Sequence, residues 1–203
     1  MFPLGAVLFP SLYLPLHVFE PRYRALVQDC LAADGQFGVV LIERGSEVGG
    51  GDQRSGVGTV AQILEAVEMD GGRWALGTVG VRRVRVQEWL VDDPYPRADV
   101  ADWPDEGRAT PDELGAVVAQ LRRVLAVAAE LGDRVPDATI ELADDVELAS
   151  FQIAAVAPLG PADQHRLLAT GSTVERLEAL AVLLQDIDED LRRRVELDGG
   201  DPG

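Results

Sequence analysis

Four residue types that take part in acid–base chemistry occur within seven positions near the start of the sequence, in the stretch HVFEPRYR. One interpretation is catalytic and makes His17 or Glu20 a general acid or base. The other is structural and places the same residues at a corner, where an extended segment meets a helix. The two interpretations predict different surroundings for the same side chains.

The residues that follow Glu20 favour the structural interpretation. Pro21 has the fixed φ angle and the missing N–H that suit the first position of a helix. The carboxylate of Glu20 is expected to accept hydrogen bonds from the first free N–H groups of that helix. Arg22 or Arg24 is expected to pair with Glu20 or with exposed acidic residues, and Tyr23 to bury its ring while its hydroxyl stays hydrogen-bonded. We therefore predict a structural corner made of Glu20, Pro21, Arg22 and Tyr23.

Other catalytic and metal-binding patterns find little support in the sequence. His17 and His165 are the only histidines and Cys30 is the only cysteine, so a zinc site would need carboxylates for most of its ligands. The sequence has no G-x-S-x-G motif, and it has no lysine for a Walker motif. We expect no catalytic residues, no metal and no cofactor.

Charge and hydropathy narrow the choice of partners. The net charge is −17, and both halves of the sequence carry more acidic residues than arginines, so we expect no nucleic acid as partner. The apolar stretch 1–19 is interrupted by Pro3, Pro10 and Pro15, which argues against a signal peptide or membrane anchor. With a single cysteine, the sequence predicts a cytoplasmic protein that has no membrane partner.

Residues 1–105 have the patterns of strands, with one helix over about 21–33. Extended segments are predicted over 4–9, 12–19, 36–43, 57–69, 73–79 and 81–90. A change of apolar phase at Ile63–Leu64 predicts a bulge, and Asp70–Gly72 predicts a hairpin turn. A long glycine-rich loop is expected over 44–56. Short strands of this spacing predict a small β-barrel that is closed or nearly closed.

The remaining residues have helical periodicity. Thr110 and Glu113 form a predicted capping box, as do Ser172 and Glu175. Helices are expected from 111, over 146–157 and 161–169, and from 172 onward. The sequence thus predicts an α+β fold, with a barrel over 1–105, a helical bundle over 106–196 and a disordered tail over 197–203.

The first thirty residues resemble a known family. The segment FPLGAVLFPSLYLPLHVFEPRYRALVQDCL is similar to the start of the Lon protease amino-terminal, substrate-binding domain. The matching elements are Phe9-Pro10, Pro15-Leu16, Phe19-Glu20 and Arg22-Tyr23. Similarity extends over about 2–190 and includes the helical part. The resemblance implies a PUA-like barrel followed by a helical bundle, and a domain that recognises unfolded or tagged polypeptide segments.

In Lon proteases this region precedes an ATPase domain and a Ser-Lys protease domain, and this sequence ends where they would begin. We therefore expect a stand-alone substrate-binding domain that is not an enzyme and acts as an adaptor in protein quality control, with a protease or chaperone as further partner. Two alternatives stay open: a small-molecule-binding regulator built on the PUA-like barrel, and an unrecognised hydrolase.

Three residues are the expected contacts to bound polypeptide. Leu12 and Tyr13 stand at the tip between two apolar runs, and Trp103 stands at the junction of barrel and bundle. The loops FPSLY and RGSEVGGGDQRSG are expected to leave strand edges and apolar side chains accessible. Binding is expected to be weak, independent of ATP and stronger for basic than for acidic segments.

Overall fold

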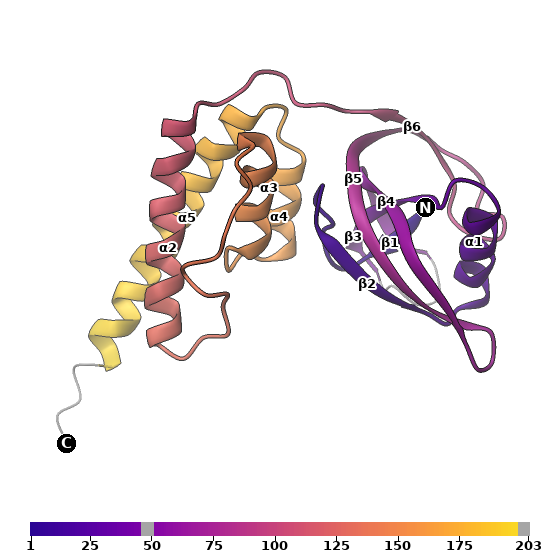
Figure 1. The fold of residues 1–203 in the computed structure, drawn as a ribbon, viewed down its shortest axis with the longest axis horizontal. Helices are drawn as coiled ribbons and strands as arrows, with labels where there is room; N and C mark the ends of the chain where they lie inside the picture. Colours follow the sequence, from indigo (N-terminus) through magenta and orange to yellow (C-terminus); the bar gives the residue numbers. More distant parts are fainter. Residues whose placement is uncertain (46–50, 199–203) are drawn as a thin grey trace. The chain divides into compact units, whose positions relative to one another are not determined.

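The computed structural model describes residues 1–45 and 51–198. The described residues divide into two compact units, one up to Pro104 and the other from Asp105 (Figure 1). The first unit contains six strands and one helix: β1 (Phe2–Leu4), β2 (Tyr13–Val18), α1 (Pro21–Ala32), β3 (Gln36–Arg44), β4 (Gln53–Met69), β5 (Arg73–Trp89) and β6 (Ala98–Asp102). The second contains four helices: α2 (Pro111–Glu130), α3 (Val146–Val156), α4 (Pro161–Leu168) and α5 (Thr173–Asp198). The predicted α+β fold is confirmed.

The six strands form one mixed sheet that curls into a half-barrel (Figure 1). The strand order is β1-β3-β4-β5-β2, and β6 pairs with the end of β5, from Val84 to Trp89. Strands β1 and β3 are parallel, whereas the other neighbours are antiparallel. Among the described strands β1 and β2 are the two ends of this order, so the sheet is open between them and the barrel is not closed.

Alternation along β2 explains which of its side chains enter the core. Leu16 and Val18 are buried, whereas Tyr13, Pro15 and His17 are exposed, as expected for a strand with one solvent face. Helix α1 covers the interior of the half-barrel with an apolar face. The side chains that α1 buries are Tyr23, Leu26, Val27 and Cys30.

The segment between β1 and β2 corrects one prediction. The apolar run 4–9 was expected to be a strand, but β1 ends at Leu4 and the following residues form a loop. Side-chain and backbone bonds hold this loop on the sheet: Thr59 Oγ1 donates to the carbonyl of Leu8 at 2.6 Å, and the amide of Ser11 donates to the carbonyl of Gly80 at 2.8 Å. The loop packs so closely that a Cβ atom at Gly80 would collide with the carbonyl oxygen of Phe9.

The meander β4–β5 is longer than predicted. Strand β4 begins at Gln53 instead of Val57, the segments 73–79 and 81–90 are one continuous strand, and β6 was not predicted. The predicted bulge is confirmed by the register shift between Ile63 and Glu65. The hairpin turn is confirmed by positive φ angles at Gly71 and Gly72. Residues 46–50 of the predicted loop lie outside the described residues.

In the second unit, the predicted capping residues have the expected contacts. The hydroxyl of Thr110 accepts from the amide of Glu113, the carboxylate of Glu113 accepts from the amide of Thr110, and Ser172 Oγ accepts from the amide of Glu175. Helix α5 continues to Asp198, so the predicted tail starts too early; its residues 199–203 lie outside the described part. The fully buried apolar side chains of this unit include Leu121, Leu125, Phe151, Ile153, Leu180 and Leu184.

One charged side chain lies at the centre of the helical unit. Arg176 on α5 is 0% exposed and forms an ion pair with Asp105, whose side chain is 2% exposed, at 2.7 Å. Its guanidinium also donates to Ser150 Oγ at 2.9 Å and to the carbonyl of Leu167 at 3.2 Å, and it lies 3.7 Å from the ring centroid of Phe151. Arg176 therefore connects α5 to α3, to α4 and to the segment that precedes α2.

Replacing this arginine is expected to destabilise the helical unit strongly. Arg176→Met removes the guanidinium that pairs with the buried carboxylate of Asp105, which also accepts from Thr173 Oγ1 at 2.6 Å, so the free energy of unfolding should fall by about 3–5 kcal/mol. Urea unfolding followed by circular dichroism measures this change.

The matched control is Arg166→Met, because Arg166 forms an ion pair with Asp163 while its side chain is 77% exposed. An exposed pair contributes about 0–1 kcal/mol, so this variant should unfold close to the wild type. Equal stability of the two variants would contradict a central role for Arg176.

Cys30 is expected to be protected in the native state. Its thiol is buried and donates to the carbonyl of Gln36 at 3.2 Å, and burial raises its pKa to about 11. Each pKa unit lowers the thiolate fraction about tenfold, so alkylation by iodoacetamide at pH 8 should be slower in the native protein than in urea by about two orders of magnitude. Mass spectrometry of timed samples measures both rates, and similar rates would contradict the described packing of α1.

Candidate functional site

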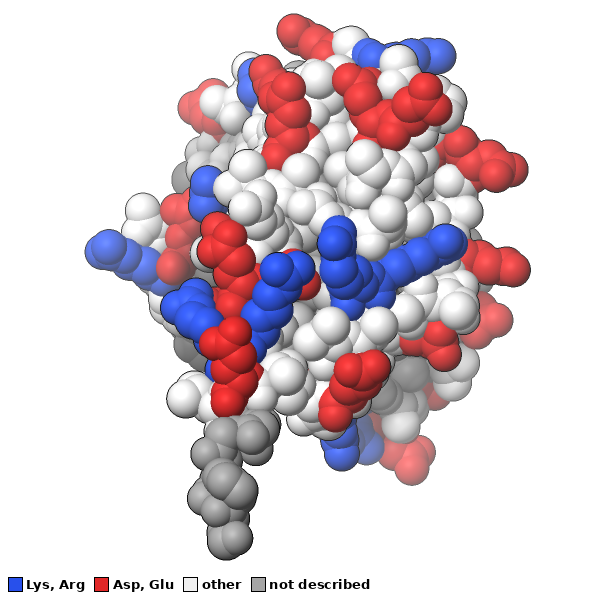
Figure 2. Space-filling model, turned by 90° about the vertical axis from the view of Figure 1, so that its left-hand side faces the viewer, with Lys and Arg blue, Asp and Glu red and all other residues white. Residues whose placement is uncertain are grey.

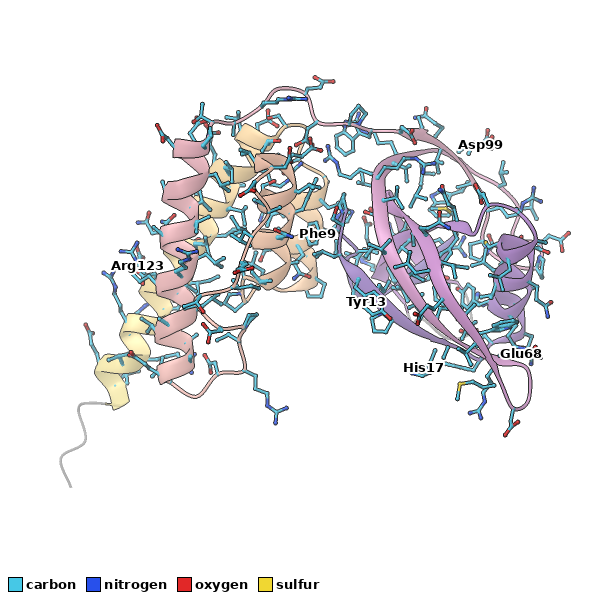
Figure 3. All side chains as sticks on the ribbon, viewed as in Figure 1. Phe9, Tyr13, His17, Glu68, Asp99 and Arg123 are labelled. Carbon is cyan, nitrogen blue, oxygen red and sulfur yellow. The ribbon has the colours of Figure 1, made fainter. Side chains whose placement is uncertain are left out.

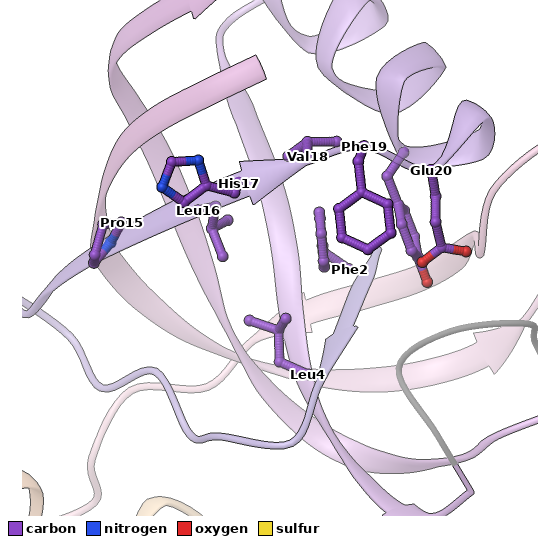
Figure 4. A pocket seen from close by; sticks show the side chains of 9 residues that line it. Phe2, Leu4, Pro15, Leu16, His17, Val18, Phe19 and Glu20 are labelled. Atoms are coloured by element: carbon purple, nitrogen blue, oxygen red, sulfur yellow. The ribbon is translucent and has the colours of Figure 1, made fainter. Parts of the chain in front are cut away.

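A hollow of about 200 Å³ lies at the open side of the half-barrel, between β1 and β2 (Figure 4). Its lining residues are Phe2, Leu4, Pro15, Leu16, His17, Val18, Phe19, Glu20 and Tyr23. Residues 15–20 are consecutive, and in β2 successive side chains point to opposite faces of the sheet. A hollow that contacts all of them lies beside the edge of the strand instead of against one face.

The edge of β2 beside the hollow carries unpaired backbone groups. The opposite edge pairs with β5: the carbonyl of Leu12 accepts from the amide of Gly80 at 2.9 Å, and the carbonyl of Leu14 accepts from Thr78 Oγ1 at 2.7 Å. Because backbone direction alternates along an antiparallel strand, the groups of residues 13, 15 and 17 point to the free edge. Pro15 fits there because it has no N–H to pair.

The wall of the hollow is formed by the corner that follows β2. The ring of Tyr23 stacks on that of Phe2, with centroids 4.3 Å apart and planes inclined by 16°. The guanidinium of Arg22 lies 4.4 Å from the centroid of Tyr23, and its Nε donates to Glu20 at 3.1 Å. Burial raises the pKa of Tyr23 to about 12.

This geometry corrects part of the prediction for Glu20. Its backbone lies at the N-cap position of α1, and Pro21 follows at the first helical position, but its carboxylate makes no capping hydrogen bond. The carboxylate pairs instead with Arg22. Glu20 therefore lines the hollow as a member of an ion pair with Arg22, and not as an isolated acid or base.

A second hollow of about 260 Å³ lies next to the end of β2 and is lined by His17, Val18, Phe19, Met69, Arg73 and Trp74. Phe19 contributes to both hollows and is 56% exposed, which is high for a large apolar side chain. Within residues 1–45 and 51–198, Trp74 Nε1 is the one buried side-chain nitrogen or oxygen atom without a hydrogen-bond partner. The two hollows share His17, Val18 and Phe19, so they are neighbours at the end of β2.

The three residues expected to bind polypeptide do not form one surface. Tyr13 is 61% exposed and points away from the interior of the half-barrel, as His17 does (Figure 3). Leu12 is half-buried and packs against the apolar core. Trp103 is only 9% exposed, with the guanidinium of Arg85 3.5 Å and that of Arg83 4.5 Å from its ring centroid. Tyr13 is therefore exposed, Leu12 is partly accessible and Trp103 is nearly buried.

Sequence reasoning missed Phe2 and Phe19 as parts of a site, and it did not identify β2 as the strand with the free edge. A signal was present in Pro15, because a proline inside a predicted strand indicates an edge strand. The pattern alone did not show that β1 would leave that edge uncovered.

The arrangement supports binding more than catalysis. It offers apolar side chains, backbone donors and acceptors, and one ion pair at its wall. In the described ranges, no group of three or more His, Cys, Asp and Glu residues is placed to hold a metal ion. The same part of the chain has no helix that is long and apolar enough to span a membrane.

Charged side chains of both signs are mixed on the face drawn in Figure 2. Arginines there lie next to acidic side chains, and the described residues of that face show no continuous basic surface. Over the whole sequence acidic residues outnumber arginines, and the net charge is −17.

Comparison with known proteins agrees with this fold. The model of the ATP-dependent protease La (LON) substrate-binding domain matches residues 1–186. Among curated relatives, Lon protease 2 of Herpetosiphon aurantiacus is 30% identical over 191 residues, which are 91% of this chain and 23% of the relative. The chain thus spans about a quarter of the length of that relative.

Two solved structures are similar to this chain. A crystal structure of a Lon N-terminal domain protein from Xanthomonas campestris superposes with a TM-score of 0.67 at 29% identity, covering 89% of this chain and 95% of that one. The N-terminal domain of a Lon protease from the Mycobacterium avium complex has a TM-score of 0.59 at 21% identity, covers 93% of this chain and 97% of that one, and supports the fold alone. On this match, the chain belongs to the Lon substrate-binding domain family.

Proposed function

We propose that this chain binds extended, apolar segments of unfolded polypeptide in the cytoplasm and carries out no catalytic step of its own. The observation that carries the proposal is the hollow beside the free edge of β2, where exposed Phe19 adjoins unpaired backbone groups. Folded proteins have few accessible apolar segments in extended form, so such a site distinguishes unfolded from folded chains.

A protease or a chaperone is the proposed further partner. The curated relatives are named Lon protease, and this chain corresponds to 23% of the length of the first of them. Recognition and cleavage would then be the tasks of different domains or proteins, and this chain would act as the adaptor that holds the segment.

The alternative of a small-molecule regulator is less well supported by the geometry. Pockets for small ligands usually enclose about 300–1,000 Å³ and bury most of the ligand. The hollow at β2 has about 200 Å³, which suits one or two side chains of a longer molecule. No arrangement of a nucleophile beside a base in this hollow supports the hydrolase alternative.

Affinity is expected to be low and sensitive to salt. An unfolded segment loses conformational freedom when it is held in one extended form, so micromolar or weaker dissociation constants are expected. The net charge of −17 should favour arginine-containing segments at a distance, and added salt should reduce that preference.

The substitution Phe19→Ser should weaken peptide binding about tenfold or more. The change removes the exposed ring shared by both hollows while leaving the core residues next to it in place. Fluorescence anisotropy of a dye-labelled peptide that combines apolar residues and arginine measures the dissociation constants. No ATP is added.

Val182→Ser is the matched control, because Val182 on α5 is 61% exposed and belongs to the other unit. It should bind like the wild type, and both variants should keep the wild-type circular dichroism spectrum. Wild-type affinity in a folded Phe19→Ser variant would remove this hollow as the binding site.

A further inference from the structure

The free edge of β2 specifies how a polypeptide would bind. We propose that the bound segment adds to the half-barrel as an antiparallel strand alongside β2, with every second side chain directed toward the hollow between β2 and β1, which has room for one or two of them. This proposal rests on the proposed function and defines the binding mode at the same site.

The first step is the set of backbone groups at the edge. The carbonyls of Leu12 and Leu14 point to β5, so those of the alternate residues point outward. The outward groups are the carbonyls of Tyr13, Pro15 and His17 and the amides of Tyr13 and His17. They are spaced as in a β-ladder, and a polypeptide backbone in extended form is the ligand with the matching spacing.

The second step is the position of the side chains. Residues of the added strand that pair directly with Tyr13, Pro15 and His17 share their face of the sheet, which is exposed. The residues between them point to the other side of the sheet, toward the part of the hollow that Phe2, Leu4, Leu16 and Val18 line. In an antiparallel pair, the amides that donate to β2 therefore belong to the solvent-facing residues of the segment. The residues that alternate with them contact the protein through their side chains.

The third step concerns the size and charge of the occupant. A strand of six residues extends about 20 Å along its edge. An interface between two folded proteins usually buries about 800 Å² on each partner, so this edge and a 200 Å³ hollow are small for a second folded copy. A single extended segment fits this length, and arginines flanking it complement the acidic chain.

The probe is a blocked synthetic peptide in which valine alternates with threonine, with one arginine at each end. Two derivatives carry N-methyl groups, one on the amides of all threonines and the other on the amides of all valines. Methylation of the threonine amides should weaken binding at least about tenfold, because these amides bond to β2. Methylation of the valine amides should change the dissociation constant less than about threefold.

Two variants test the same contact from the side of the protein. His17→Pro removes an amide that points to the free edge, and His17→Ala keeps that amide while removing the imidazole. Binding of the parent peptide should be about tenfold weaker in His17→Pro than in His17→Ala, because only the proline removes the amide. Circular dichroism and thermal unfolding identify a His17→Pro variant that does not fold, in which case the N-methylated peptides decide.

Different outcomes overturn different claims. If the parent peptide binds but both methylated peptides bind equally, strand addition is wrong while peptide binding stands. If methylation of the valine amides is the damaging change, the antiparallel register is wrong. No binding of the parent peptide up to millimolar concentration overturns the proposed function as well. A dimer in sedimentation velocity that the peptide dissociates would assign the edge to a second copy and overturn the proposal.

Discussion

The helical unit depends on a buried ion pair between residues that are 71 positions apart, Arg176 and Asp105. Taking both charges out of water costs several kcal/mol, so the pair is stable only because the remaining donors of the guanidinium also have partners. Ser150, the carbonyl of Leu167 and the ring of Phe151 supply these contacts from α3 and α4. The arrangement of three helices and the segment before α2 is thus fixed by the hydrogen-bonding geometry of a single planar side chain.

The helices were predictable from the sequence, but this centre was not. Capping residues such as Thr110 and apolar residues at helical spacing are local signals, so the helix starts at 111, 146, 161 and close to 172 agree with the structure. Arg176 lies within the leucine stripe of α5, where an arginine is usually solvent-exposed. Its partner at Asp105 has no local relationship to it, and only the packed structure shows that the two meet.

The same difference between local sequence signals and contacts of distant residues explains the errors in the first unit. The run 4–9 is as apolar as a strand, yet its backbone bonds to the side chain of Thr59, which no periodicity reveals. In β2 the alternation of residues indicated the buried face, but it did not show that one edge of the strand would stay unpaired. Trp103 was a reasonable candidate for an accessible surface until β5 was seen to place two guanidinium groups against its ring.

Pro15 also matters when no polypeptide is bound at the free edge of β2. An uncovered strand edge is a template on which copies of a protein can assemble into a continuous sheet, a common route to insoluble deposits. A ring without N–H in the middle of the edge interrupts the regular series of donors that such growth would need. A proline at this position is therefore expected to shorten the stretch of edge on which copies of the protein could pair.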